Sequence, residues 1–257
     1  LSHLSLAPSE PTMHSEPLQA QKQTVPSEFD RVARRYDLLT GMNPGYKKHL
    51  RWSAERMQLG PGRDVQVLDL CCGTGLSTQA LVGAYPRAQL TGLDASAGML
   101  AVAASKPWAR DVRWVCGDAM DPAASGVPGP FDGILMAYGI RNMPDPDLCL
   151  QRLLALLKPG GVICFHEYSV NDSRWTRLLW NAVSPGIIIP AGLVTAPRSD
   201  IYRYLRTSVN NFDGATAFQA RLARIGFTDQ HRHTMDGWQV GIVHSFLARR
   251  PADPTPL

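Results

Sequence analysis

The hydrophobic positions along most of the chain follow one of two periods. Short, nearly continuous apolar runs are typical of strands buried on both faces, whereas apolar residues spaced three and four apart are typical of amphipathic helices. Five strands are expected at residues 65–71, 88–94, 112–118, 131–140 and 162–169, with helices between them at 75–85, 96–106 and 146–157. This alternation predicts an α/β fold with a doubly wound, mostly parallel sheet.

The pattern changes on either side of this core, which we place at residues 61–170. Residues 1–26 are rich in Ser, Pro, Gln and Glu and lack a period, which predicts a disordered tail, and residues 27–60 predict an N-terminal helical cap. Residues 171–212 show no strand pattern. Such an insertion covers a binding site or adds to the core. Residues 213–250 predict a helix and an antiparallel hairpin that completes a seven-stranded sheet.

Length, charge and cysteines narrow the class of protein. The 257 residues suffice for one large domain, and a net charge of +4 with scattered basic residues argues against a nucleic-acid partner. The longest apolar patch, at 185–194, is broken by prolines and glycines and is too short to span a bilayer. Five cysteines without a C-x-x-C pair argue against a disulfide framework or a metal site and favour a cytoplasmic location.

A glycine turn follows the first strand of the core. The stretch "VLDLCCGTG" at 67–75 leads from a strand, through Cys71 and Cys72, to Gly73 and Gly75 and then into a helix. In this context the glycines let the backbone pass close to a ligand at the strand ends. A dinucleotide and S-adenosylmethionine both fit such a turn.

Carboxylates around the turn separate these two ligands. Asp94 ends the second strand, where it can accept both ribose hydroxyls of a nucleoside, and Asp118 ends the third, within reach of an adenine amino group. Asp69 precedes the glycines; it suits the ammonium group of S-adenosylmethionine and would repel a pyrophosphate, although it can also serve as a cap. A dinucleotide site prefers a further glycine where Thr78 stands. The expected cofactor is therefore S-adenosylmethionine.

These motifs resemble those of class I S-adenosylmethionine-dependent methyltransferases, in particular the C-methyltransferases of ubiquinone and menaquinone biosynthesis. The resemblance covers about residues 29–248, and "GIRN" at 139–142 and "YRYL" at 202–205 are its specific parts. It implies a Rossmann-like enzyme that methylates a carbon of a prenylated quinol ring. Open alternatives are an O-, N- or C-methyltransferase of a specialised aromatic or polyketide-like metabolite, an NAD-dependent oxidoreductase, and an inactive binding protein.

The resemblance also assigns cofactor contacts by position. Tyr36 would close over the methionine end, and Ala137 stands where the family usually has a serine. With the residues of the glycine turn, the predicted cofactor contacts are Tyr36, Asp69, Gly73, Thr74, Gly75, Asp94, Asp118, Ala119 and Ala137.

Arg141 and His166 are the expected catalytic residues. The resemblance implies that Arg141 faces the substrate and stabilises a phenolate, while His166, Glu167 or a water molecule acts as the base. The structural alternatives are a salt bridge from Arg141 to Asp145 or Asp147, and a core position for His166. The expected partner is a small hydrophobic aromatic substrate. A peripheral membrane contact and a homodimer are left open.

Overall fold

The computed structural model of the chain describes residues 37, 40–41, 43, 45–184 and 201–252, without the side chains of 201–203. The predicted tail, Tyr36 and the apolar patch at 185–194 lie outside the described residues.

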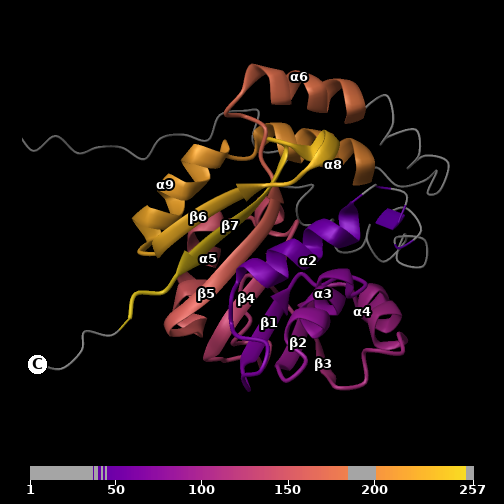
Figure 1. The fold of residues 1–257 in the computed structure, drawn as a ribbon, viewed down its shortest axis with the longest axis vertical. Coiled ribbons are helices and arrows are strands. Elements are labelled where there is room, and N and C mark those ends of the chain that lie inside the picture. Colours follow the sequence, from indigo (N-terminus) through magenta and orange to yellow (C-terminus); the bar gives the residue numbers. More distant parts are fainter. Residues whose placement is uncertain (1–36, 38–39, 42, 44, 185–200, 253–257) are drawn as a thin grey trace, which may run out of the picture.

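A seven-stranded sheet runs through the centre of the described chain (Figure 1), in the order β3-β2-β1-β4-β5-β7-β6. The first five strands in this order are parallel, and β7 runs antiparallel to both β5 and β6. The strands are β1 Gln66–Leu70, β2 Gln89–Asp94, β3 Val112–Cys116, β4 Phe131–Ala137, β5 Leu157–Tyr168, β6 Thr228–Thr234 and β7 Val243–Arg249. The predicted mostly parallel sheet with a terminal hairpin is confirmed.

Helices cover both faces of this sheet. One core joins α2 and α3 to side chains such as Val67 and Leu135, and the other joins α5 and α9 to Leu68 and Ile134. Neighbouring residues of one strand therefore enter opposite cores, which explains the nearly continuous apolar runs. The helices are α2 Tyr46–Arg56, α3 Leu76–Ala84, α4 Ala97–Ala104, α5 Pro146–Leu156, α6 Arg174–Val183, α8 Ile201–Asn211 and α9 Ala215–Ile225, with short 3₁₀ turns η1 Ile140–Asn142 and η3 Gly237–Gln239.

Two strand boundaries differ from the predicted ones by three residues or more, and the others by at most two. The prediction continued β4 to residue 140, but the strand ends at Ala137 because Tyr138 takes a positive φ of 58° and η1 follows. The prediction began β5 at residue 162, after a "KPGG" stop. The helix does end at Leu156, but the strand starts at once, because the backbone of Arg250 pairs with Gly160 and Gly161 and extends the sheet.

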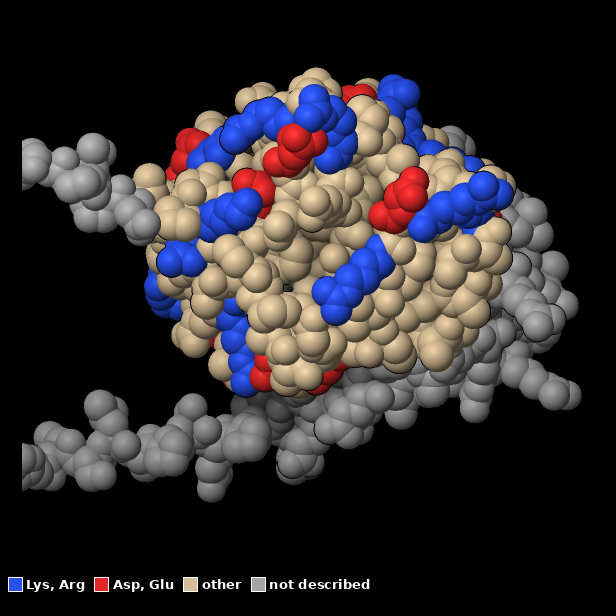
Figure 2. All heavy atoms as spheres, turned by 90° about the horizontal axis from the view of Figure 1, so that it is seen from below, with Lys and Arg blue, Asp and Glu red and all other residues tan. Residues whose placement is uncertain are grey.

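The surface of the described chain mixes charges where it is seen from below. Figure 2 shows Lys and Arg side chains interspersed with Asp and Glu on that face, without a field of one sign. Within the described residues, no helix combines the length and the apolar character needed to cross a membrane.

Candidate active site

The strand order reverses direction between β1 and β4, and ligands of open α/β sheets bind at the carboxyl ends of strands at such a point. Cys71 follows β1 and Tyr138 follows β4, and both have a φ of 58° although neither is glycine. Side chains with a β-carbon adopt this left-handed conformation at a cost, and such residues cluster at functional sites. Both features place the candidate site at this edge of the sheet.

The two glycines of the turn have different reasons to be glycine. A β-carbon on Gly75 would approach Trp108 to 2.9 Å and Trp114 to 3.1 Å, so packing excludes a side chain. A β-carbon on Gly73 would meet nothing within 4 Å. Gly73, with a φ of 53°, therefore borders open space in which a ligand can approach the backbone.

The carboxylate of Asp94 ties the end of β2 to this turn. Its two oxygens accept hydrogen bonds from the backbone amides of Gly73 and Ser96, each at 2.8 Å. Asp118 lies beyond the end of β3, exposed, and accepts from the amide of Met120, while Ala119 beside it is buried. The predicted contacts after β2 and β3 thus lie along the same edge as the glycine turn, and their roles toward a cofactor stay predictions.

Asp69 is fully buried inside β1 and is only half satisfied. One carboxylate oxygen accepts from the hydroxyls of Ser77 and Thr78, at 2.8 and 2.5 Å, and the other has no partner in the described chain. Burial raises the pKa of this carboxyl to about 7. An unpartnered buried oxygen is costly, and an ammonium group would satisfy it.

A contact that the sequence analysis missed closes over the turn. Asp37 accepts from the Thr74 hydroxyl at 2.5 Å and forms an ion pair with Lys106 at 2.6 Å, and Lys106 also donates to the Thr74 carbonyl. The Thr74 side chain, predicted to contact the cofactor, is therefore engaged by Asp37. The only sequence signal was an acidic residue directly after Tyr36.

Arg141 lies on η1, buried, and makes an ion pair with Glu167 of β5 at 2.5 Å. The predicted structural partners were wrong, because Asp145 caps α5 and Asp147 pairs with Arg221. The guanidinium of Arg141 lies over the rings of Tyr138 and Tyr168, at 6.0 and 5.6 Å from their centroids.

This ion pair keeps unused hydrogen-bonding capacity. The Nε and Nη1 groups of Arg141 donate to Ser208, Glu167 and the Tyr138 carbonyl, and its Nη2 group has no acceptor among the described residues. The Oε2 atom of Glu167 is likewise buried without a partner there. Burial raises the pKa of the Glu167 carboxyl, and the adjacent Arg141 opposes that rise.

A cavity of about 90 Å³ borders Arg141, between α8 and the start of α5. It is lined in part by Ser208, Phe212, Asp213 and Arg221. The volume is enough for a few water molecules and too small for a bicyclic ring.

His166 is fully buried on β5 and both ring nitrogens have protein partners. Nδ1 contacts the Ser53 hydroxyl at 2.8 Å and Nε2 contacts the Tyr138 hydroxyl at 2.9 Å. Burial lowers the pKa of the ring to about 3, so it is neutral near pH 7. These contacts match the core alternative for His166 and make it a poor base.

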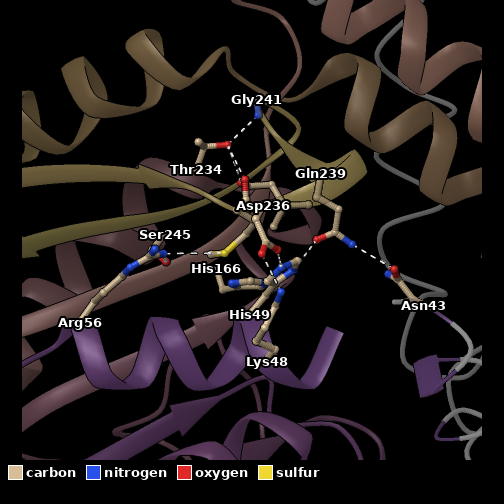
Figure 3. A network of polar contacts seen from close by, with 12 residues as sticks. Asn43, Lys48, His49, Arg56, His166, Thr234, Asp236, Gln239, Gly241 and Ser245 are labelled. Atoms are coloured by element: carbon tan, nitrogen blue, oxygen red, sulfur yellow. Dashed lines mark hydrogen bonds and ion pairs between the residues drawn. The ribbon is translucent and has the colours of Figure 1, made fainter. Parts of the chain in front are cut away.

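The chain of hydrogen bonds continues from Ser53 to Ser245 and Arg56, part of the network in Figure 3. Arg56 can only donate, so Ser245 accepts from it. Every donor then has a partner if Ser245 donates to Ser53 and Ser53 donates to Nδ1 of His166. The proton of the imidazole is thereby assigned to Nε2, which donates to Tyr138.

Aromatic rings form one wall at this edge of the sheet. The ring of Tyr138 stacks on Tyr46 with centroids 5.7 Å apart and lies 4.9 Å from Tyr168, which in turn contacts Trp180 of α6 at 5.0 Å. Flat, partly apolar surfaces of this kind suit an aromatic ring.

Cys71 and Cys72 line the turn and carry no redox or metal chemistry that the structure supports. All five cysteines are free thiols, and burial raises the pKa of both Cys71 and Cys72. The sulfur of Cys71 lies 2.9 Å from where a β-carbon on Gly139 would be, and the sulfur of Cys72 lies 3.1 Å from the same position on Gly92. Both thiols therefore pack against the backbone of a glycine. Within the described ranges, no cluster of three or more His, Cys, Asp or Glu residues is arranged to hold a metal ion.

Solved structures share this arrangement of sheet and helices. The cyclase SpnF superposes with a TM-score of 0.65 and 18% identity, over 90% of this chain and 97% of that one. The plantazolicin methyltransferase BamL was solved with a triazolic desmethylPZN analog and SAH. It superposes with a TM-score of 0.64 and 17% identity, over 92% of this chain and 97% of that one. At these identities the likeness shows the fold alone, which is the Rossmann-like methyltransferase fold.

The family follows from the sequence comparisons. The model of the ubiE/COQ5 methyltransferase family matches residues 18–248, and a demethylmenaquinone methyltransferase of Staphylococcus aureus is 28% identical over 239 residues, 92% of this chain and 97% of that protein. The chain belongs to the ubiE/COQ5 methyltransferase family and is an S-adenosylmethionine-dependent methyltransferase. The open space at Gly73 and the unpartnered oxygen of Asp69 fit this cofactor, and the oxidoreductase alternative receives no support.

Proposed function

We propose that this enzyme methylates a ring carbon of a prenylated quinol, as its relatives named demethylmenaquinone methyltransferase suggest. The observation that carries the proposal is the buried Arg141–Glu167 pair, which lies against the rings of Tyr138 and Tyr168 at the carboxyl edge of the sheet. A flat ring with an ionisable hydroxyl matches both the aromatic wall and the charged pair.

The cofactor supplies a methyl group that is already activated, so the chain has to align the acceptor and make it nucleophilic. Alignment alone can lower the barrier by roughly 7–11 kcal/mol. A quinol carbon next to a hydroxyl becomes nucleophilic as that hydroxyl loses its proton. In our proposal Glu167 Oε2 accepts this proton and Arg141 stabilises the phenolate. Burial raises the pKa of the Glu167 carboxyl, which makes its carboxylate a stronger base than an exposed one.

We assign His166 a positioning role, because both of its nitrogens are engaged inside the protein. Its Nε2–H donates a hydrogen bond to the Tyr138 hydroxyl. This bond fixes the orientation of the Tyr138 ring, over which the Arg141 guanidinium lies. By the resemblance of the sequence to this family, a leucine usually stands at the position of His166 and a phenylalanine at that of Tyr138. This polar pair favours a second candidate function, methylation of a more polar aromatic or polyketide-like metabolite.

The first test replaces Arg141 by Ala and measures methyl transfer from labelled cofactor to short-tailed demethylmenaquinol. We expect turnover to fall by about 10²–10³-fold, the effect of removing one charge-stabilising donor. Affinity for the cofactor, measured by calorimetry, should change less than about threefold. Arg110→Ala removes an exposed arginine elsewhere and should leave both quantities unchanged. Full turnover by Arg141→Ala would exclude this residue from the mechanism.

The second test separates the base from the ion pair. Glu167→Gln preserves the size of the side chain and an acceptor for Arg141 but removes the proton acceptor, so we expect a similar loss of kcat with KM little changed. Mass spectrometry of the product locates the methyl group. A methyl on oxygen, or activity with polar aromatic metabolites and none with quinols, would favour the second candidate function.

A further inference from the structure

The outward face of α6 carries exposed apolar side chains. Trp175, Leu178 and Leu179 have exposed fractions of 81%, 61% and 43%, although surface helices normally bury their apolar stripe. Figure 1 shows α6 at one end of the molecule, beyond α8. The helix is held to the protein by its opposite face, through the fully buried Trp180 and the Thr176 hydroxyl, which donates to the Val170 carbonyl.

We propose that α6 docks this enzyme on an anionic membrane surface. At 100° per residue, Leu178, Trp175 and Leu179 form one continuous outward stripe, and Arg174 and Arg177 border it on one side. An outward stripe of Trp and Leu with arginines beside it is the pattern of a helix that lies in the plane of a lipid interface. Trp also prefers the headgroup level of membranes.

The net positive charge of α6 favours an anionic membrane surface over a neutral one. The sequence of α6, RWTRLLWNAV, holds two arginines and no acidic residue. Neither Arg174 nor Arg177 forms an ion pair with any residue in the described ranges, so both charges remain for anionic headgroups.

A second copy of the chain fits this surface less well. Three exposed apolar side chains fall far short of the about 800 Å² that each partner buries in a standard protein interface. A twofold dimer through α6 would also bring the arginines of both copies to one interface, and the helix offers no carboxylate to pair with them.

The same helix connects this surface to the candidate site. α6 follows the carboxyl end of β5, and its buried Trp180 contacts Tyr168, whose ring lies under Arg141. A membrane at the outer face of α6 would therefore lie one helix away from the aromatic wall. This link rests on the proposed function, since a prenylated quinol resides in the bilayer; the docking surface itself does not.

The test is binding of the full chain to vesicles of phosphatidylcholine alone and of phosphatidylcholine with phosphatidylglycerol, by sedimentation and tryptophan fluorescence. We expect binding to the anionic vesicles, accompanied by a blue shift of the tryptophan emission. High salt should weaken this binding at least tenfold. The triple variant Trp175→Ser, Leu178→Ser, Leu179→Ser should lose this binding, and Arg174→Gln with Arg177→Gln should lose the preference for anionic vesicles.

Leu148→Ser serves as the matched control, because Leu148 is an exposed apolar residue, 37% accessible, on α5 and not on α6. It should bind vesicles as the unchanged protein does. Turnover of a water-soluble quinol and the thermal shift caused by the cofactor confirm that every variant is folded. Equal binding to both vesicle types, no binding to either, or a dimer in solution that the triple variant abolishes would each overturn the proposal. These outcomes do not depend on which quinol is methylated.

Discussion

At the scale of single residues, Cys71 occupies a conformation that favours glycine. Its φ of 58° costs a residue with a β-carbon about 1–2 kcal/mol. We therefore predict that Cys71→Gly is nearly neutral, within about 1 kcal/mol, because relief of the unfavourable φ is offset by the lost packing of sulfur and by the greater flexibility of glycine in the unfolded chain. Cys71→Ala keeps the unfavourable φ and loses the packing of sulfur, so it should be destabilising. Urea denaturation of both variants compares them, and the opposite ranking would contradict this account.

Asp69 links stability and cofactor binding to pH. Its folded pKa of about 7 lies above the ordinary value of 3.8, so between these values the folded protein holds more protons than the unfolded chain. Stability without cofactor should therefore decrease as pH rises from about 4 to 7. Because an ammonium ligand favours the ionised carboxylate, binding of S-adenosylmethionine near pH 6.5 should release a proton. Calorimetry in buffers of different ionisation enthalpy detects this release, which Asp69→Asn should abolish.

At the scale of elements, the ends of β4 and β5 are joined by the hydrogen bond between Tyr138 and His166. We predict that Tyr138→Phe and His166→Leu each destabilise the fold by about 1–3 kcal/mol, since each leaves a buried polar group without its partner. The double variant, which returns both positions to the family pattern, should cost less than the sum of the two. A coupling energy near zero in denaturant titrations would mean that the pair does not act as a unit.

Contacts between distant elements could not have been predicted from the sequence. His49 of α2 contacts Asp236 and Gln239 in the hairpin connection, and Lys48 pairs with the same Asp236, as Figure 3 shows. These partners lie 187 to 190 positions apart in the sequence. No local pattern marks such partners, because each side chain alone is equally suited to a solvated position.

At the scale of the whole molecule, S-adenosylmethionine should stabilise the fold by mass action. At about 100 times its dissociation constant the ligand adds about 2.7 kcal/mol, which for a domain of this size corresponds to a rise in Tm of roughly 5–10 °C. S-adenosylhomocysteine should act similarly, whereas NAD should have no effect, because Asp69 would repel its pyrophosphate. A shift with NAD and none with S-adenosylmethionine would contradict the cofactor assignment.

The sequence by itself determined the order of strands and helices and the class of cofactor. The order of elements follows from periodicity, which shows which faces of each element are buried. The class of cofactor follows from the glycine turn and the carboxylates Asp69 and Asp94, which lie close together along the chain. Only the tertiary structure decided the partners of the buried polar groups: Glu167 for Arg141, Tyr138 and Ser53 for His166, and Asp37 for Thr74. Such partners come from different strands and helices, and a buried charge or imidazole specifies that it needs a partner but not which one.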